Sequence, residues 1–142
     1  MNTSLACCVD ASFVLRLIVE PRNPSLLQYW DEWERDGRLL VAPRLLLYEL
    51  ANALHQYRKA GRLNSQATIS AFTTALQMPI ALTDSSEIHQ RALELAEAYS
   101  LPAAYDAHYL ALAESLGAEL WTADRRLAQK VQDQLPWVRV VG

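Results

Sequence analysis

Four carboxylates are the residues of this sequence that we expect to carry chemistry: Asp10, Glu49, Asp106 and Asp124. Two unit charges about 4 Å apart repel by roughly 4 kcal/mol at an effective dielectric of 20. If the fold brings these acids together, the cluster must take up protons or bind a cation. Hard oxygen ligands suit Mg²⁺ or Mn²⁺, which activate water and neutralise a phosphate when held in this way. The chemistry that the four acids predict is hydrolysis of a phosphodiester.

Two of the acids lie on the apolar stripes of predicted helices. Glu49 follows Leu46 by three residues and precedes Ala53 by four, so it falls at the margin of that stripe. Asp106 shares a helical line with Leu110 and lies in a first turn, where the helix dipole favours an anion. Desolvating a carboxylate costs several kcal/mol, so these positions indicate a function or a specific partner.

Each acid also has a structural alternative. Asp10 and Asp124 follow predicted strands, where an aspartate often does no more than cap the next helix. Glu49 has the alternative of a buried ion pair with an arginine such as Arg16, and Asp106 that of an ordinary first-turn acid.

Strands and helices alternate along the chain. We predict strands at 5–9, 39–42, 80–82, 119–121 and 138–141, and helices at 11–19, 25–36, 43–60, 65–76, 86–99, 103–116 and 124–134. This order predicts an α/β fold, a three-layer sandwich whose central parallel sheet of four to five strands is flanked by helices. Ligands of such sheets bind outside the carboxyl ends of the strands, which is where Asp10 and Asp124 should lie.

Length and composition indicate an ordinary globular protein. We expect residues 1–142 to form one domain, with 51% hydrophobic and 20% charged residues. The net charge of −3 argues against a broad surface that coats nucleic acid, although a few arginines beside a site can hold phosphate. The amino terminus lacks a basic start and a long apolar core, and we see no candidate membrane span, so we expect a cytoplasmic protein.

Four segments carry a resemblance to a known family. Residues 9–12, 48–54, 104–113 and 121–127 resemble the motifs of PIN-domain nucleases, and in particular of VapC-type toxins from type II toxin–antitoxin pairs. The resemblance covers essentially the whole chain. Each motif alone is weak, but four in the correct order on the expected elements are specific together.

The resemblance implies a PIN-like fold and a metal-dependent endoribonuclease whose four acids bind Mg²⁺ or Mn²⁺. It also implies that Ser12 and Thr122 support the site with hydroxyl hydrogen bonds. Arg125 and Arg126 follow the last acid, where they either meet RNA phosphates or remain solvated. As partners the family implies an RNA substrate, a second copy in a homodimer, and a VapB-like antitoxin that inserts into the active-site groove.

Two other functional classes compete with the nuclease. The first is a PIN-fold RNA-binding or protein-binding regulatory module with little or no catalysis, and the four intact acids argue against it. The second is a phosphate-accepting receiver domain, which expects paired acids after its first strand, whereas Asp10 is followed by Ala11. We expect the histidines to be surface or packing residues, and Tyr29, Trp30 and Trp33 to serve helix packing or a dimer contact rather than to stack on bases.

Overall fold

Five parallel strands form the centre of the protein. The computed structural model describes residues 5–141. The strands are β1 (Ala6–Val9), β2 (Leu39–Ala42), β3 (Ile80–Leu82), β4 (Glu119–Thr122) and β5 (Val138–Val140), in the spatial order β3-β2-β1-β4-β5. β2 and β3 are added in turn on one side of β1, and β4 and β5 are then added in turn on its other side. The β1–β4 boundary is therefore the topological switch point, where sheets of this kind bind ligands.

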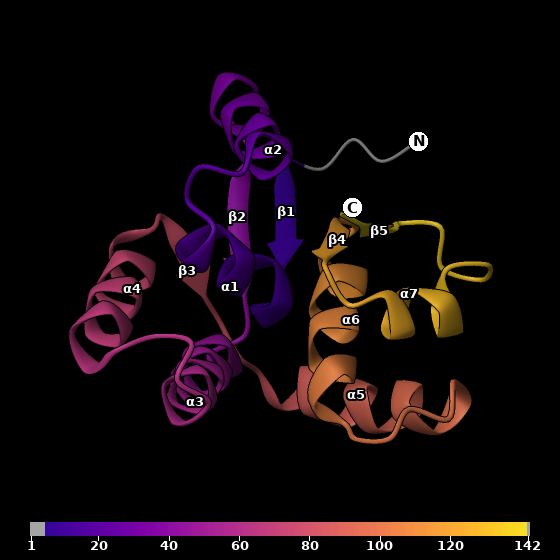
Figure 1. The fold of residues 1–142 in the computed structure, drawn as a ribbon. Helices are drawn as coiled ribbons and strands as arrows, with labels where there is room; N and C mark the ends of the chain where they lie inside the picture. Colours follow the sequence, from indigo (N-terminus) through magenta and orange to yellow (C-terminus); the bar gives the residue numbers. More distant parts are fainter. Residues whose placement is uncertain (1–4, 142) are drawn as a thin grey trace.

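Helices cover the sheet from both sides. In the described part of the chain they are α1 (Ala11–Val19), α2 (Pro24–Arg35), α3 (Leu45–Lys59), α4 (Ser65–Gln77), α5 (Ser86–Ala98), α6 (Tyr105–Leu116) and α7 (Arg125–Val131). α1, α3 and α4 pack together in one layer, whereas α6 lies against β1 and β4 from the other side and α5 covers α6 (Figure 1). The predicted three-layer sandwich is confirmed, with five strands. No helix between residues 5 and 141 has the length and apolar character needed to cross a membrane.

Three helices differ from the predicted bounds by two residues or more. α3 begins at Leu45 rather than at residue 43, and α6 begins at Tyr105 rather than at residue 103, with Ala104 as an N-cap that makes no side-chain hydrogen bond. α7 ends at Val131, three residues early. There the carbonyl of Val131 accepts hydrogen bonds from the N–H groups of Gln134 (3.1 Å) and Leu135 (2.8 Å), which turns the chain toward β5.

Aromatic rings join α1, α2 and β4. Trp33 lies 5.3 Å from Phe13 and 5.5 Å from Trp121 between ring centroids, and Tyr29 lies 4.8 Å from Trp121. Such ring pairs add about 0.5–1.5 kcal/mol each beyond the burial of their area. The packing role predicted for Tyr29 and Trp33 is confirmed.

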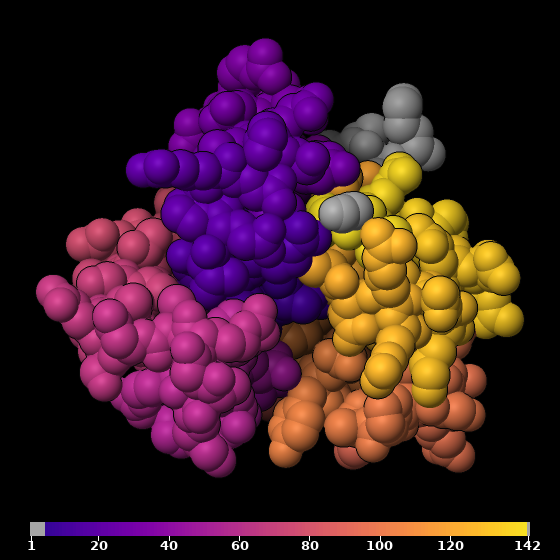
Figure 2. Space-filling view, in the orientation of Figure 1, coloured from indigo at the N-terminus to yellow at the C-terminus, as the bar shows by residue number. Residues whose placement is uncertain are grey.

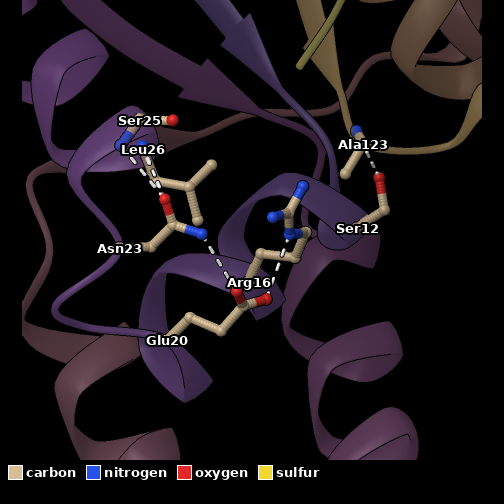
Figure 3. A network of polar contacts seen from close by, with 7 residues as sticks. All are labelled: Ser12, Arg16, Glu20, Asn23, Ser25, Leu26 and Ala123. Carbon is tan, nitrogen blue, oxygen red and sulfur yellow. Dashed lines mark hydrogen bonds and ion pairs between the residues drawn. The ribbon is translucent and has the colours of Figure 1, made fainter. Parts of the chain in front are cut away.

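A polar network fixes the turn between α1 and α2. Arg16 Nε lies 3.1 Å from Glu20 Oε2, and Asn23 donates to the other oxygen of Glu20 at 3.0 Å (Figure 3). Asn23 Oδ1 in turn accepts from the N–H groups of Ser25 and Leu26 and caps α2. α1, whose first residues lie beside the acids, is thereby anchored at its far end.

Burial predicts that two leucines on neighbouring helices contribute very differently to the free energy of unfolding. Leu110 on α6 is fully buried, so we expect Leu110→Ala to lower the free energy of unfolding by about 3 kcal/mol. Leu93 on α5 is 66% exposed, and Leu93→Ala should change it by less than about 0.5 kcal/mol. Urea unfolding of the metal-free proteins measures both values, and equal losses would contradict the packing described.

Candidate active site

Asp10 and Asp124 flank the switch point as helix caps. Asp10 Oδ1 accepts a hydrogen bond from the N–H of Phe13 at 3.0 Å and caps α1. Asp124 Oδ1 accepts from the N–H groups of Arg126 (3.0 Å) and Leu127 (3.2 Å) and caps α7. The capping alternative is therefore correct for both residues. Capping is compatible with a role in an active site, because the cap hydrogen bonds hold both carboxylates at the carboxyl edge of β1 and β4.

Two hydroxyls join the ends of these strands. Ser12 Oγ donates to Asp10 Oδ1 at 2.7 Å and accepts from the N–H of Ala123 at 2.9 Å, the contact drawn in Figure 3. Thr122 Oγ1 lies 3.1 Å from Ser12 Oγ and accepts from the N–H of Asp124 at 2.9 Å. Through Ser12 and Thr122, the position of one acid depends on the position of the other.

Glu49 reaches the edge from α3, where it receives a neutral donor. The hydroxyl of Tyr109, on α6, donates to Glu49 Oε1 at 2.6 Å. The ion pair of Arg16 on the neighbouring helix is with Glu20 instead. Within residues 5–141, the ion pairs of the structure engage none of the four acids. The alternative of a buried ion pair with Arg16 therefore has no support, and the partner of the Glu49 carboxylate is the neutral hydroxyl of Tyr109.

The electrostatics of the acids are coupled through Asp106. Burial is the largest of the effects that raise the pKa of Asp10 to about 6; the charge of Asp106 contributes to this rise, and the hydrogen bonds of Thr122, Ser12 and Phe13 oppose it. Burial and the charge of Asp124 raise the pKa of Asp106. Burial also raises the pKa of Glu49; the Tyr109 hydrogen bond opposes this rise and the charge of Asp106 adds to it. The charge of Asp106 therefore disfavours ionisation of Asp10 and Glu49, and the charge of Asp124 disfavours ionisation of Asp106.

The donor set suits a hard dication. Between residues 5 and 141 no three Asp, Glu, His or Cys side chains already converge tightly enough to hold a metal ion. Mg²⁺ does not require this, since it usually takes one or two carboxylates and completes six ligands with water and substrate oxygens. A dication would also oppose the repulsion between the acids, which adds to the effect of burial on their pKa values. The surface is hollowed where α3, α6 and α7 approach one another (Figure 2), and Glu49, Asp106 and Asp124, on or beside these helices, are partly exposed.

The remaining candidates lie at the rim or away from the acids. Arg125 and Arg126 are exposed at the start of α7, next to Asp124. His108 Nδ1 lies 2.7 Å from the carbonyl oxygen of Ala104, and its Nε2 lies 2.9 Å from His89 Nδ1, so this pair ties α5 to the start of α6.

Tyr109 is the site residue that sequence reasoning missed. It follows Asp106 by three residues and therefore shares its helical face. A buried tyrosine on that face needs a partner for its hydroxyl, and this requirement was the available signal. The partner itself, Glu49, lies 60 residues away in the sequence.

Comparisons with known proteins agree with this fold. A family model described as the PIN domain matches residues 7–132. Ribonuclease VapC3 of Pyrobaculum aerophilum is 34% identical over 130 residues, covering 86% of this chain and 92% of the relative. Exonuclease VapC9 of the same organism is 30% identical over 110 residues, covering 76% and 79%. This chain belongs to the PIN domain family. Within that family, it groups with proteins named VapC.

Solved structures share the same architecture. The crystal structure of PAE2754 from Pyrobaculum aerophilum matches with a TM-score of 0.66 at 28% identity, covering 88% of this chain and 78% of that chain. A toxin–antitoxin complex from Klebsiella pneumoniae matches with a TM-score of 0.61 at 19% identity, covering 93% and 94%. At the lower identity the likeness establishes the fold.

The raised pKa of Asp10 predicts how stability depends on pH. A folded-state pKa of about 6, against 3.8 in the unfolded chain, means that folding favours the protonated acid. Stability should therefore fall as pH rises from about 4 through 6, by roughly 3 kcal/mol for a shift of this size. Asp10→Asn keeps the Oδ1 acceptor for Ser12 and Phe13 but cannot ionise, so it should be more stable than wild type at pH 7 and similar at pH 4.

Urea unfolding with chelator at both pH values measures this effect. Asp133→Asn, which removes an exposed acid just beyond the C-terminal end of α7, is the matched control and should follow the wild-type profile. An Asp10→Asn protein less stable than wild type at pH 7 would contradict the repulsive environment described.

Proposed function

We propose that this chain is a metal-dependent endoribonuclease and the toxin of a toxin–antitoxin pair, acting in the cytoplasm as one domain spanning residues 1–142. The observation that carries the proposal is that the charge of Asp106 acts on Asp10 and Glu49 and the charge of Asp124 acts on Asp106, with no ion pair to any of these four acids within residues 5–141. A binding module gains nothing from such repulsion. The name of VapC3, a ribonuclease, supports RNA as the substrate.

In the proposed mechanism, the four acids hold Mg²⁺ or Mn²⁺. The bound metal supplies activation of water and neutralisation of the phosphodiester. Ser12 and Thr122 fix the carboxylate of Asp10 and the start of α7, so the ligands are oriented before the metal arrives. Arg125 and Arg126 extend from the rim toward solvent, where their guanidinium groups suit the phosphates of the bound strand.

Substitution of the central acid tests the enzyme assignment. Asp106→Asn removes the charge to which the other three acids are coupled, and we expect RNA cleavage in Mg²⁺ or Mn²⁺ to fall more than about 100-fold, since even outer partners of metal ligands are worth 10–100-fold. Asp133→Asn should cleave as wild type does. If Asp106→Asn binds RNA and cleaves it at the wild-type rate, the proposal fails. If wild type binds RNA but no divalent ion yields cleavage, the regulatory-module alternative is correct.

A circular RNA separates internal from terminal cleavage. One relative is named an exonuclease, so the choice between internal and terminal cleavage has to be tested for this chain itself. An endoribonuclease linearises a circular RNA, whereas an exonuclease leaves it intact and degrades only the linear form. We expect linearisation that depends on Mg²⁺ or Mn²⁺, assayed by gel electrophoresis with Asp106→Asn as the inactive control.

The proposed partners are a VapB-like antitoxin and a second copy of the chain. Carboxylates that make no ion pair within residues 5–141 suit a basic side chain of an inserted antitoxin segment, and the Klebsiella pneumoniae match is itself a toxin–antitoxin complex. Induction of the chain in cells should arrest growth, and co-expression of a cognate VapB-like antitoxin should relieve it. Arrest that persists in Asp106→Asn would refute the nuclease toxin.

A further inference from the structure

The hydrogen bonds of three site acids fall on one oxygen each. Asp10 Oδ1 accepts from Ser12 and Phe13, and Asp124 Oδ1 accepts from two backbone N–H groups. Glu49 Oε1 accepts from the hydroxyl of Tyr109. For the two aspartates the donors belong to the cap of the same helix. Glu49 differs, because its donor comes from another helix and is a single side chain.

Tyr109 is buried, and its hydroxyl faces Glu49. The residue is 1% exposed, and its backbone carbonyl oxygen lies 3.8 Å from Cys8 Sγ on β1. Its hydroxyl donates to Glu49 Oε1 at 2.6 Å. The buried ring thus holds the hydroxyl against one oxygen of Glu49.

A carboxylate oxygen that already accepts a hydrogen bond affects the binding of Ca²⁺ and of Mg²⁺ differently. Ca²⁺ takes six to eight oxygen ligands in flexible geometry and accepts carboxylates through both oxygens. Mg²⁺ requires six ligands near octahedral geometry and usually takes carboxylates one oxygen at a time, with several waters. A carboxylate with one oxygen held by a protein donor therefore suits Mg²⁺ and disfavours Ca²⁺.

We propose that Tyr109 is a positioning residue that sets the metal selectivity of the site, because its hydrogen bond withholds one oxygen of Glu49 and so favours Mg²⁺ over Ca²⁺. The inference rests on the proposed metal-dependent function and adds to it the choice of ion. Tyr109 does not touch the ion in this proposal; it acts through Glu49.

The test compares Mg²⁺ and Ca²⁺ binding by wild type and Tyr109→Phe. Each metal-free protein is titrated with MgCl₂ or CaCl₂, and the dissociation constants are taken from the rise in unfolding temperature with cation concentration. Tyr109→Phe removes the hydroxyl and keeps the ring. We expect the ratio of Ca²⁺ affinity to Mg²⁺ affinity to increase about tenfold, the factor that corresponds to a hydrogen bond to a charged group. Tyr29→Phe, which removes a hydroxyl in the aromatic cluster instead, should leave the ratio unchanged.

The ratio separates selectivity from a general structural effect. A loosened site would bind both ions more weakly and leave their ratio as in wild type, so an unchanged ratio in Tyr109→Phe overturns the inference while wild-type binding of Mg²⁺ still supports the proposed function. Absence of any shift with Mg²⁺, Mn²⁺ or Ca²⁺ in wild type overturns both.

A second measurement does not depend on the folding of the variant. In a crystal of the wild-type protein grown with Ca²⁺, we expect one oxygen of Glu49 on the ion and the Tyr109 hydroxyl still within hydrogen-bond distance of the other. Both oxygens of Glu49 on Ca²⁺, with the Tyr109 hydrogen bond broken, would overturn the inference.

Discussion

Repulsion between carboxylates at the carboxyl edge of β1 and β4 is the unfavourable interaction that the rest of the structure has to offset. Asp106 lies at its centre, because its charge acts on Asp10 and Glu49 and is itself affected by Asp124. A neighbouring arginine would relieve the repulsion, yet within residues 5–141 the ion pairs lie elsewhere, as in Arg91 with Glu114. Asp10, Glu49 and Asp124 are held by neutral donors instead: backbone N–H groups, two hydroxyls and one phenol. Neutral donors fix the geometry and leave the negative charge for a cation.

Three separate parts of the fold supply these donors. The switch in strand order places β1 beside β4, so that the Asp10 cap and the Asp124 cap share one edge. The Ser12–Thr122 contact joins the ends of the two strands. The Tyr109–Glu49 hydrogen bond then links α6 to α3, which belong to opposite helix layers. Phe13, Tyr109 and Thr122 are buried, so these parts of the site are oriented before any ligand binds.

Much of this could be predicted from the sequence, because it depends on local pattern. The alternation of apolar runs with helical stripes predicted five strands and seven helices, and most bounds agree within two residues. The edge position of Asp10 and Asp124 followed from their place directly after strands. The ends of α6 and α7 were less predictable, since they depend on caps and on carbonyl contacts of the turns that follow.

The sequence by itself determined which residues carry charge, which helix faces are apolar, and which chain segments form strands, since these properties depend on residues a few positions apart. Only the tertiary structure decided that Glu49 would pair with Tyr109 rather than with Arg16, and that Asp106 would be the acid to which the other three are coupled. These relations join residues separated by dozens of positions, and their energies depend on distance and burial. Both quantities are set by how the layers pack, which the local pattern of the chain does not contain.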